Sequence, residues 1–209
     1  MDGPHLIYFA DPMCSWCYGF SPVIEEIRTA FGAALPIRLV MGGLRPGTDT
    51  PMAEAAKSEL KGHWTHVHDA TGLPFTGGAL DADGFVYDTD PAARAVVLVR
   101  HADPDAALSY LSALQRAFYA EGLNITRAEV LAELAGAHGV RRDAFLADFE
   151  TDRLKQATWR DYAISQRAGV QGFPTLVAGP AENGTYGAVT RGYQSADVVL
   201  PLLRRWLGG

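Results

Sequence analysis

Cys14 and Cys17 are the only two cysteines in the 209-residue sequence, and two residues separate them. In the first turn of a helix this spacing brings the side chains to about 5–6 Å from each other, within reach of a disulfide. A thiol at the helix amino terminus faces unpaired backbone N–H groups, which stabilise a thiolate and make Cys14 a nucleophile. Cys17, one turn further in, is better shielded and suits the later, intramolecular attack. The pair therefore predicts redox chemistry.

Two other interpretations of the cysteine pair remain open. A C-x-x-C pair is half of many structural zinc sites, but such a site needs four ligands and the sequence has no second cysteine pair. The cysteines are alternatively plain core residues, although the junction of a strand and a helix is an unusual place to bury both. His63, His66 and His68 lie close together, yet at most two of them share a helix face, so we expect surface polarity rather than a metal site.

A second feature lies far along the chain, at Phe173 and Pro174. The proline stands at the first residue of a predicted strand, one of the few positions that a sheet tolerates. If the Phe173–Pro174 bond is cis, the chain turns sharply and the backbone of Phe173 becomes available to pair with an extended substrate. The alternative is an ordinary trans proline that opens a strand.

The elements that must position these residues follow from hydrophobic periodicity. Residues 5–10 form an apolar, aromatic run closed by Asp-Pro, which predicts a buried strand. From Ser15 the apolar residues fall on one helical face until Gly32, and residues 37–41 predict a second strand. A strand–helix–strand unit of this length favours parallel strands with a right-handed crossover.

The middle of the chain, from about residue 50 to residue 167, has helical rather than strand periodicity. We expect helices over residues 92–101 and 106–119, and one short and one longer helix within residues 143–167. A further helix is predicted to begin at Thr126, with Glu129 completing a capping box. The glycine-, proline- and aspartate-rich residues 71–90 predict a loop.

Strand periodicity returns after residue 169. Residues 175–178 and 186–191 predict two strands joined by a turn, and a final helix follows Ser195 as its N-cap. This order predicts an α/β fold in which residues 1–49 and 168–209 form a core. Residues 50–167 then form an inserted helical domain.

Composition excludes several classes of function. The sequence has 18 Lys and Arg against 24 Asp and Glu, a net charge of −6, which opposes accumulation on nucleic acid or anionic lipid. No run approaches the roughly 20 apolar residues of a membrane-spanning helix. The start of the sequence lacks the basic and apolar regions of a signal peptide, so we expect a cytoplasmic protein.

Residues 11–22 (DPMCSWCYGFSP) together with residues 169–177 (GVQGFPTLV) resemble the DsbA-like thioredoxin superfamily. The likeness is strongest to its cytosolic FrnE-like members, protein-disulfide isomerases or oxidoreductases. It implies a thioredoxin fold interrupted by a helical lid over the active-site groove, with a cis Pro174 facing the two cysteines. The implied catalytic residues are Cys14, Cys17 and Pro174, and the implied substrate-binding residues are Ser15, Trp16 and Phe173.

Two positions depart from the pattern of this superfamily. Periplasmic DsbA has a histidine between its cysteines that helps to stabilise the thiolate, whereas this chain has Ser15 and Trp16. Thioredoxin and DsbA carry a buried acid six residues before the first cysteine, and here that residue is Tyr8. The usual proton acceptor for the resolving thiol is therefore missing, and water or another group must serve.

Together these features predict a thiol–disulfide oxidoreductase or isomerase that acts on protein or small disulfide substrates. The expected partners are disulfide- or dithiol-containing proteins or glutathione, and no dissociable cofactor is needed because the cysteine pair carries the electrons. One alternative is a glutathione-dependent enzyme similar to the kappa-type transferases and chromene-carboxylate isomerases, which commonly have serine at the first cysteine position. Another is a non-enzymatic binding or chaperone module.

Overall fold

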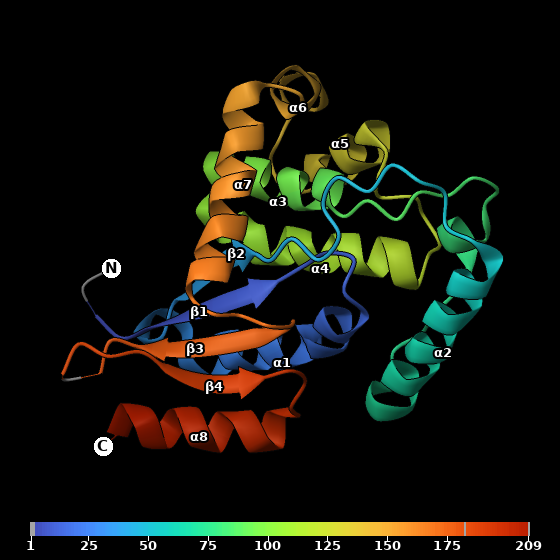
Figure 1. Cartoon of the computed structure of the whole chain (residues 1–209). Coiled ribbons are helices and arrows are strands. Elements are labelled where there is room, and N and C mark those ends of the chain that lie inside the picture. The colour runs from blue at the N-terminus through green and yellow to red at the C-terminus, as the bar shows by residue number, and fades with distance from the viewer. Residues whose placement is uncertain (1–2, 182, 209) are drawn as a thin grey trace.

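A four-stranded sheet forms the centre of the molecule in the computed structural model, with the strand order β2-β1-β3-β4 (Figure 1). β1 (His5–Ala10) and β2 (Ile37–Met41) are parallel, whereas β3 (Thr175–Gly179) runs antiparallel to β1, and β4 (Gly187–Arg191) antiparallel to β3. Two segments separated by more than 130 residues therefore form one sheet. This confirms the predicted α/β thioredoxin fold with a helical insertion.

Helices cover the sheet and extend beyond one of its edges. The structure describes residues 3–181 and 183–208, so residues 1–2, 182 and 209 of the predicted core lie outside the described residues. The predicted domain boundaries near residues 49 and 168 stay a prediction.

The α-helices are α1 (Ser15–Phe31), α2 (Glu54–Thr71), α3 (Asp90–Ala102), α4 (Ala107–Tyr119), α5 (Ala128–Gly136), α6 (Arg142–Phe149), α7 (Asp152–Arg167) and α8 (Ala196–Gly208).

β1 and α1 form the part of the core that carries the cysteines. Tyr8 points from β1 toward α1, where its ring lies 5.9 Å from the ring of Phe20. The apolar face of α1 is buried, as expected from the spacing of Val23, Ile24 and Ile27. Gly32 ends the helix with a φ of +49°, a conformation that favours glycine. Burial of this face fixes the first turn of α1 against the end of β1.

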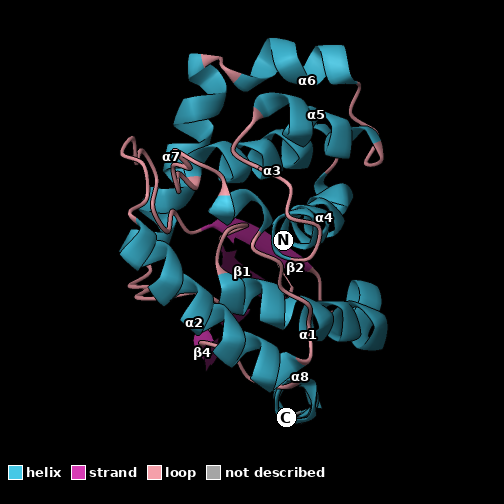
Figure 2. Ribbon diagram, turned by 90° about the vertical axis from the view of Figure 1, so that its right-hand side faces the viewer, coloured by secondary structure: helices cyan, strands magenta, loops and turns pink. Residues whose placement is uncertain are grey.

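The inserted helices contact the sheet mainly at the β2 edge. In Figure 2, α3, α5 and α6 lie on the opposite side of the sheet from α8. Arg100 of α3 and Asp161 of α7 form a two-bond ion pair, at 2.7 and 3.0 Å. Arg100 also donates to the carbonyl of Leu39, and the Asp161 carboxylate accepts from the N–H of Met41. The pair therefore joins two helices of the insertion to one strand.

The capping box predicted at Thr126 is wrong. α5 begins at Ala128 after Arg127, without a side-chain cap. The hydroxyl and the N–H of Thr126 are both bonded to the side chain of Asn124, 2.7 and 3.0 Å away. The Asn124 side chain forms a local turn of its own, which competes with the capping geometry.

No helix in the described part of the chain is long and apolar enough to cross a membrane.

The Asp161→Ala substitution should lower the free energy of unfolding by about 3 kcal/mol, because it leaves the half-buried Arg100 guanidinium without its partner. Urea denaturation of the purified protein measures this loss. Asp148→Ala is the matched control, since its ion pair with Arg153 is exposed and contributes less than about 1 kcal/mol. Equal losses in the two variants would contradict the role of the buried pair.

Candidate functional site

The two cysteines lie at the amino end of α1, as predicted. Cys14 is the N-cap residue, with extended backbone angles, and Cys17 lies in the first turn. The Cys14 N–H donates to the carbonyl of Asp11, 3.2 Å away, which fixes the turn between β1 and the helix. The first turn contains no acidic residue, so no side-chain carboxylate there offsets the helix dipole beside Cys14.

Both cysteines are free thiols, and they differ in burial. Cys14 keeps 8% of its surface exposed, whereas Cys17 is fully buried. Burial raises the pKa of Cys17 well above its usual value, and the hydrogen bond with the Cys14 thiol adds to this increase. The outer sulfur is therefore the one that an incoming group reaches first.

Phe173 meets Cys14 from the other end of the sequence. The Cys14 thiol donates to the Phe173 carbonyl, with a sulfur–oxygen distance of 3.5 Å. The Phe173–Pro174 peptide bond is cis. The carbonyl of the buried Pro174 accepts from the N–H of Gly192 at 2.7 Å, so this segment is held from β4 as well.

The ring of Phe173 occupies space that only a glycine leaves free. A Cβ atom on Gly42 would lie 2.2 Å from two ring carbons of Phe173, far inside van der Waals contact. At the neighbouring Gly43, a Cβ would lie 2.9 Å from the Tyr162 ring, and its φ of +74° also favours glycine. Gly42 therefore leaves room for the Phe173 ring, and Gly43 leaves room for the Tyr162 ring.

The other two predicted site residues, Ser15 and Trp16, lie at the rim of the site, which is the first turn of α1 next to Cys14. Ser15 and Trp16 are half-buried, and the Trp16 ring lies 5.6 Å from the ring of Tyr193. Tyr193 also contacts Phe20 of α1. Tyr193 thus supports Trp16 from the segment that follows β4.

Tyr8 occupies the place where the superfamily carries a buried acid. Its hydroxyl has no hydrogen-bond partner among residues 3–181 and 183–208. Burial raises its pKa well above the usual value, and the nearby charges of Cys17 and Cys14 raise it further. Tyr8 therefore stays neutral and does not replace a carboxylate.

The three histidines are spread over the exposed surface of α2. His63 and His66 have their rings 6.5 Å apart, while His68 bonds to the carbonyl of Leu73 at 2.8 Å. In the described part of the chain, no group of three or more His, Cys, Asp or Glu side chains is placed to hold a metal ion.

Three residues near the cysteines were not recognised as site residues in the sequence. The carboxylate of Asp11 accepts from the N–H groups of Met13 and Leu44. The hydroxyl of Tyr87 donates to the Met13 carbonyl, and the ring of Tyr193 lies against Trp16. Only Asp11 left a signal, as a carboxylate three residues before a cysteine in an otherwise apolar stretch.

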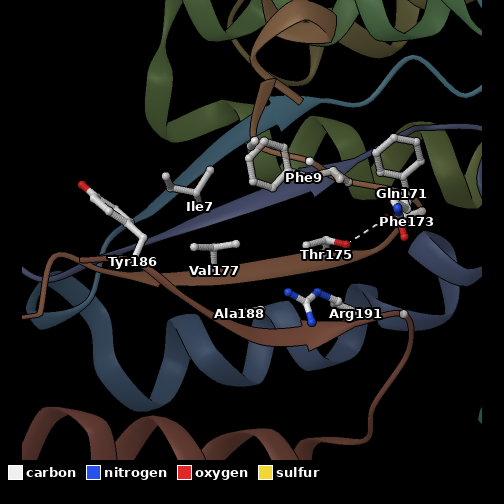
Figure 3. A pocket seen from close by; sticks show the side chains of 14 residues that line it. Ile7, Phe9, Gln171, Phe173, Thr175, Val177, Tyr186, Ala188 and Arg191 are labelled. Atoms are coloured by element: carbon white, nitrogen blue, oxygen red, sulfur yellow. Dashed lines mark hydrogen bonds between the residues drawn. The ribbon is translucent and has the colours of Figure 1, made fainter. Parts of the chain in front are cut away.

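An open cavity of about 650 Å³ lies beside the Phe173 segment, on the sheet face opposite α1 (Figure 3). Apolar side chains of β1, β3 and β4 form its floor. Residues 168–173 close one end, and Arg191 stands at its margin. Its lining includes Ile7, Phe9, Val177, Tyr186 and Ala188.

Comparison with known proteins gives a consistent set of relatives. The family model of the DSBA-like thioredoxin domain matches residues 5–200. The crystal structure of a proposed protein disulfide isomerase from Nitrosomonas europaea is similar, with a TM-score of 0.89 and 36% identity over 99% of this chain and 98% of that one. The cytosolic disulfide reductase DsbM from Pseudomonas aeruginosa has a TM-score of 0.72 and 27% identity, over 98% and 95% of the two chains.

The chain is also similar to proteins that are described as ClpXP adapters and not as oxidoreductases. The ClpXP adapter protein SpxH from Shouchella clausii is 25% identical over 200 residues, which are 96% of this chain and 66% of the relative. The chain therefore spans just under two thirds of the length of the curated relatives that it matches.

Gly42→Ala should lower the free energy of unfolding by about 1–3 kcal/mol and slow the reaction of Cys14 with a disulfide reagent, because the Phe173 ring must move. Urea denaturation and the initial rate with Ellman's reagent measure the two effects. Gly62→Ala is the control, since it lies exposed in α2 with nothing near the added Cβ and should stabilise by about 0.5–1 kcal/mol. A normal Cys14 rate in Gly42→Ala would contradict the coupling between Gly42 and Cys14.

Proposed function

The chain belongs to the DSBA-like thioredoxin domain family, and we propose that it is a thiol–disulfide oxidoreductase in which Cys14 attacks and Cys17 resolves. The resemblance drawn from residues 11–22 and 169–177 is thereby confirmed at the level of the family. The roles of individual residues are part of the proposal.

The contact between Cys14 and Phe173 is the observation that carries this proposal. A nucleophilic thiol at a helix amino terminus lies 3.5 Å from a backbone carbonyl that belongs to a distant segment. A substrate disulfide that reaches Cys14 therefore also meets the Phe173 backbone, which can pair with an extended chain. Cysteines that only fill the core do not require a contact between the outer thiol and the backbone of a distant segment.

The reaction proceeds by two exchanges. The Cys14 thiolate attacks one sulfur of the substrate disulfide, so that a Cys14–substrate bond forms and the other substrate sulfur leaves with the electron pair. Cys17 then loses its proton and attacks the Cys14 sulfur. The Cys14–Cys17 disulfide forms, the second substrate thiolate leaves, and the substrate is reduced by two electrons. The reverse sequence oxidises a dithiol.

Substrate contacts are assigned to the rim of the site. Phe173 and Pro174 supply the backbone edge, and Ser15 and Trp16 supply the surface beside Cys14. Trp16, held by Tyr193, offers an apolar wall that suits a peptide side chain. The helical insertion then acts as a lid over the groove.

The expected partners are disulfide-containing proteins or glutathione, in the cytoplasm. Support comes from the DsbM structures, one of which is described as cytosolic disulfide reductase with GSH. The intact cysteine pair favours redox exchange over the glutathione transferase alternative, since a transferase needs only one residue at the first position. Glutathione fits here as an electron donor to the oxidised pair.

A second candidate function is that of an adapter, favoured by the similarity to the ClpXP adapter proteins SpxH. In that case the surface around the cysteines binds a partner protein without exchange. The same experiment distinguishes the two functions.

The Cys17→Ala variant should accumulate covalent mixed disulfides with disulfide-containing proteins, because Cys14 still attacks but no thiol resolves the adduct. Dithiothreitol should reduce these adducts. Non-reducing electrophoresis followed by mass spectrometry measures them. Cys14→Ala is the matched control and should trap far less, since its remaining thiol is fully buried.

Two outcomes would contradict parts of this proposal. More adducts with Cys14→Ala than with Cys17→Ala would invert the roles of the two cysteines. Partner binding that persists after both cysteines are replaced by serine, with no adduct in any variant, would favour the adapter function.

A further inference from the structure

Arg45 lies in the segment that follows β2, and two hydrogen bonds hold its backbone in place. The Arg45 N–H donates to the hydroxyl of Thr89, just before α3, at 3.0 Å. The Thr89 N–H donates in turn to the Arg45 carbonyl at 3.2 Å, and Thr89 itself is fully buried. The backbone of Arg45 therefore has a fixed position between the sheet and the inserted helices.

The Arg45 side chain lies over the buried ring of Tyr87. Its guanidinium carbon is 5.6 Å from the centre of this ring, within the range of a cation–π contact. The Tyr87 hydroxyl, at the end of the same ring, donates to the carbonyl of Met13, the residue before Cys14. One tyrosine side chain therefore connects the cation to the turn that carries the attacking thiol.

The charge of Arg45 has no acidic partner among residues 3–181 and 183–208, where none of the ion pairs involves its guanidinium. Asp88, which contacts the same segment, instead accepts from the N–H groups of Gly47 and Asp90. Arg45 is also exposed, in a chain whose net charge is −6. Its guanidinium is therefore free to bind an anion from solution.

A carboxylate is the anion that fits this position in a disulfide-exchange reaction. A guanidinium binds a carboxylate through two parallel N–H···O bonds, which neutral groups do not match. One or two residues of extended chain span about 3.5–7 Å. This length is comparable with the tyrosine side chain that separates Arg45 from the turn of Cys14. A carboxylate one or two residues away from the reacting sulfur therefore reaches the guanidinium.

We propose that Arg45 is a specificity-determining residue, which binds a carboxylate of the substrate close to the sulfur that Cys14 attacks. This inference rests on the proposed function of the cysteine pair. The substrate class is then that of thiols and disulfides with a nearby carboxylate. Glutathione supplies one on the glycine that follows its cysteine, and a polypeptide supplies one on an acidic residue beside a cysteine. Arg45 attracts and orients the substrate and takes no part in the exchange of bonds.

Two matched pairs of disulfides test this in the full-length Cys17→Ala variant, in which only the first exchange takes place. The first pair is oxidised glutathione and its glycine ethyl ester. The second pair is the disulfides of acetyl-Cys-Gly-Asp-amide and acetyl-Cys-Gly-Asn-amide. Acid quenching and intact-mass spectrometry give the rate at which Cys14 forms each mixed disulfide. The two pairs distinguish glutathione from an acidic peptide as the source of the carboxylate.

Adding Arg45→Gln should slow the acidic member of at least one pair by about three- to tenfold, because the substitution removes its charge-assisted hydrogen bonds. The neutral member should change by less than about twofold, which also shows that the site remains folded. Arg45→Lys keeps the charge without the paired N–H groups and should retain part of the preference. An ionic strength of about 1 M should weaken the preference, since the Debye length falls to about 3 Å.

Arg38→Gln is the matched control. Arg38 is also exposed, but it lies near the start of β2, at the end of the strand away from the cysteines. An equal loss of preference in this control would overturn the inference, because the overall charge would then be the cause. Equal changes for the acidic and neutral members of both pairs in Arg45→Gln would also overturn it. If Cys14 forms no adduct with any of these disulfides while Arg45 is intact, the proposed function fails instead.

Discussion

Two buried carboxylates hold the carboxyl ends of the parallel strands, and the rest of the site depends on them. Asp161 binds the N–H of Met41 at the end of β2, and Asp11 binds the N–H groups of Met13 and Leu44 after β1 and β2. Arg100 neutralises Asp161, which makes that carboxylate a structural joint. Asp11 has no ion-pair partner in the described part of the chain, and burial raises its pKa to about 6.

The helical insertion contributes to the site as well as covering the sheet. The hydroxyl of Tyr87 donates to the Met13 carbonyl, beside the turn that carries Cys14. The side chain of Thr89 accepts from the N–H of Arg45 and so holds the segment after β2 against the start of α3. Tyr162 of α7 packs over Gly43 and donates to Asp90. Residues of the sheet and of the inserted helices therefore together hold the segments around the cysteines in place.

Local patterns predicted most of this fold. The bounds of β1 and β2 were predicted from apolar runs, and the position of the cysteines followed from the change of period at Ser15. The features that were missed depend on contacts between distant residues. Backbone donors such as the N–H of Leu44 leave no trace in a sequence, so nothing showed that Asp11 would be buried and doubly bonded. The error at Thr126 arose because Asn124 takes the hydroxyl that a capping box would use.

Because Cys14 and Cys17 lie three positions apart, their disulfide closes a ring of only four residues. Such a short ring constrains an unfolded chain by a small and nearly fixed amount, close to that of a free peptide with the same spacing. The reduction potential of the folded pair therefore departs from that of the peptide only through the native environment of the site, such as the hydrogen bond from the Cys14 thiol to the Phe173 carbonyl and the burial of Cys17. By the thermodynamic cycle, the same contacts set the difference in folding stability between the oxidised and reduced protein, so each quantity can be read from the other.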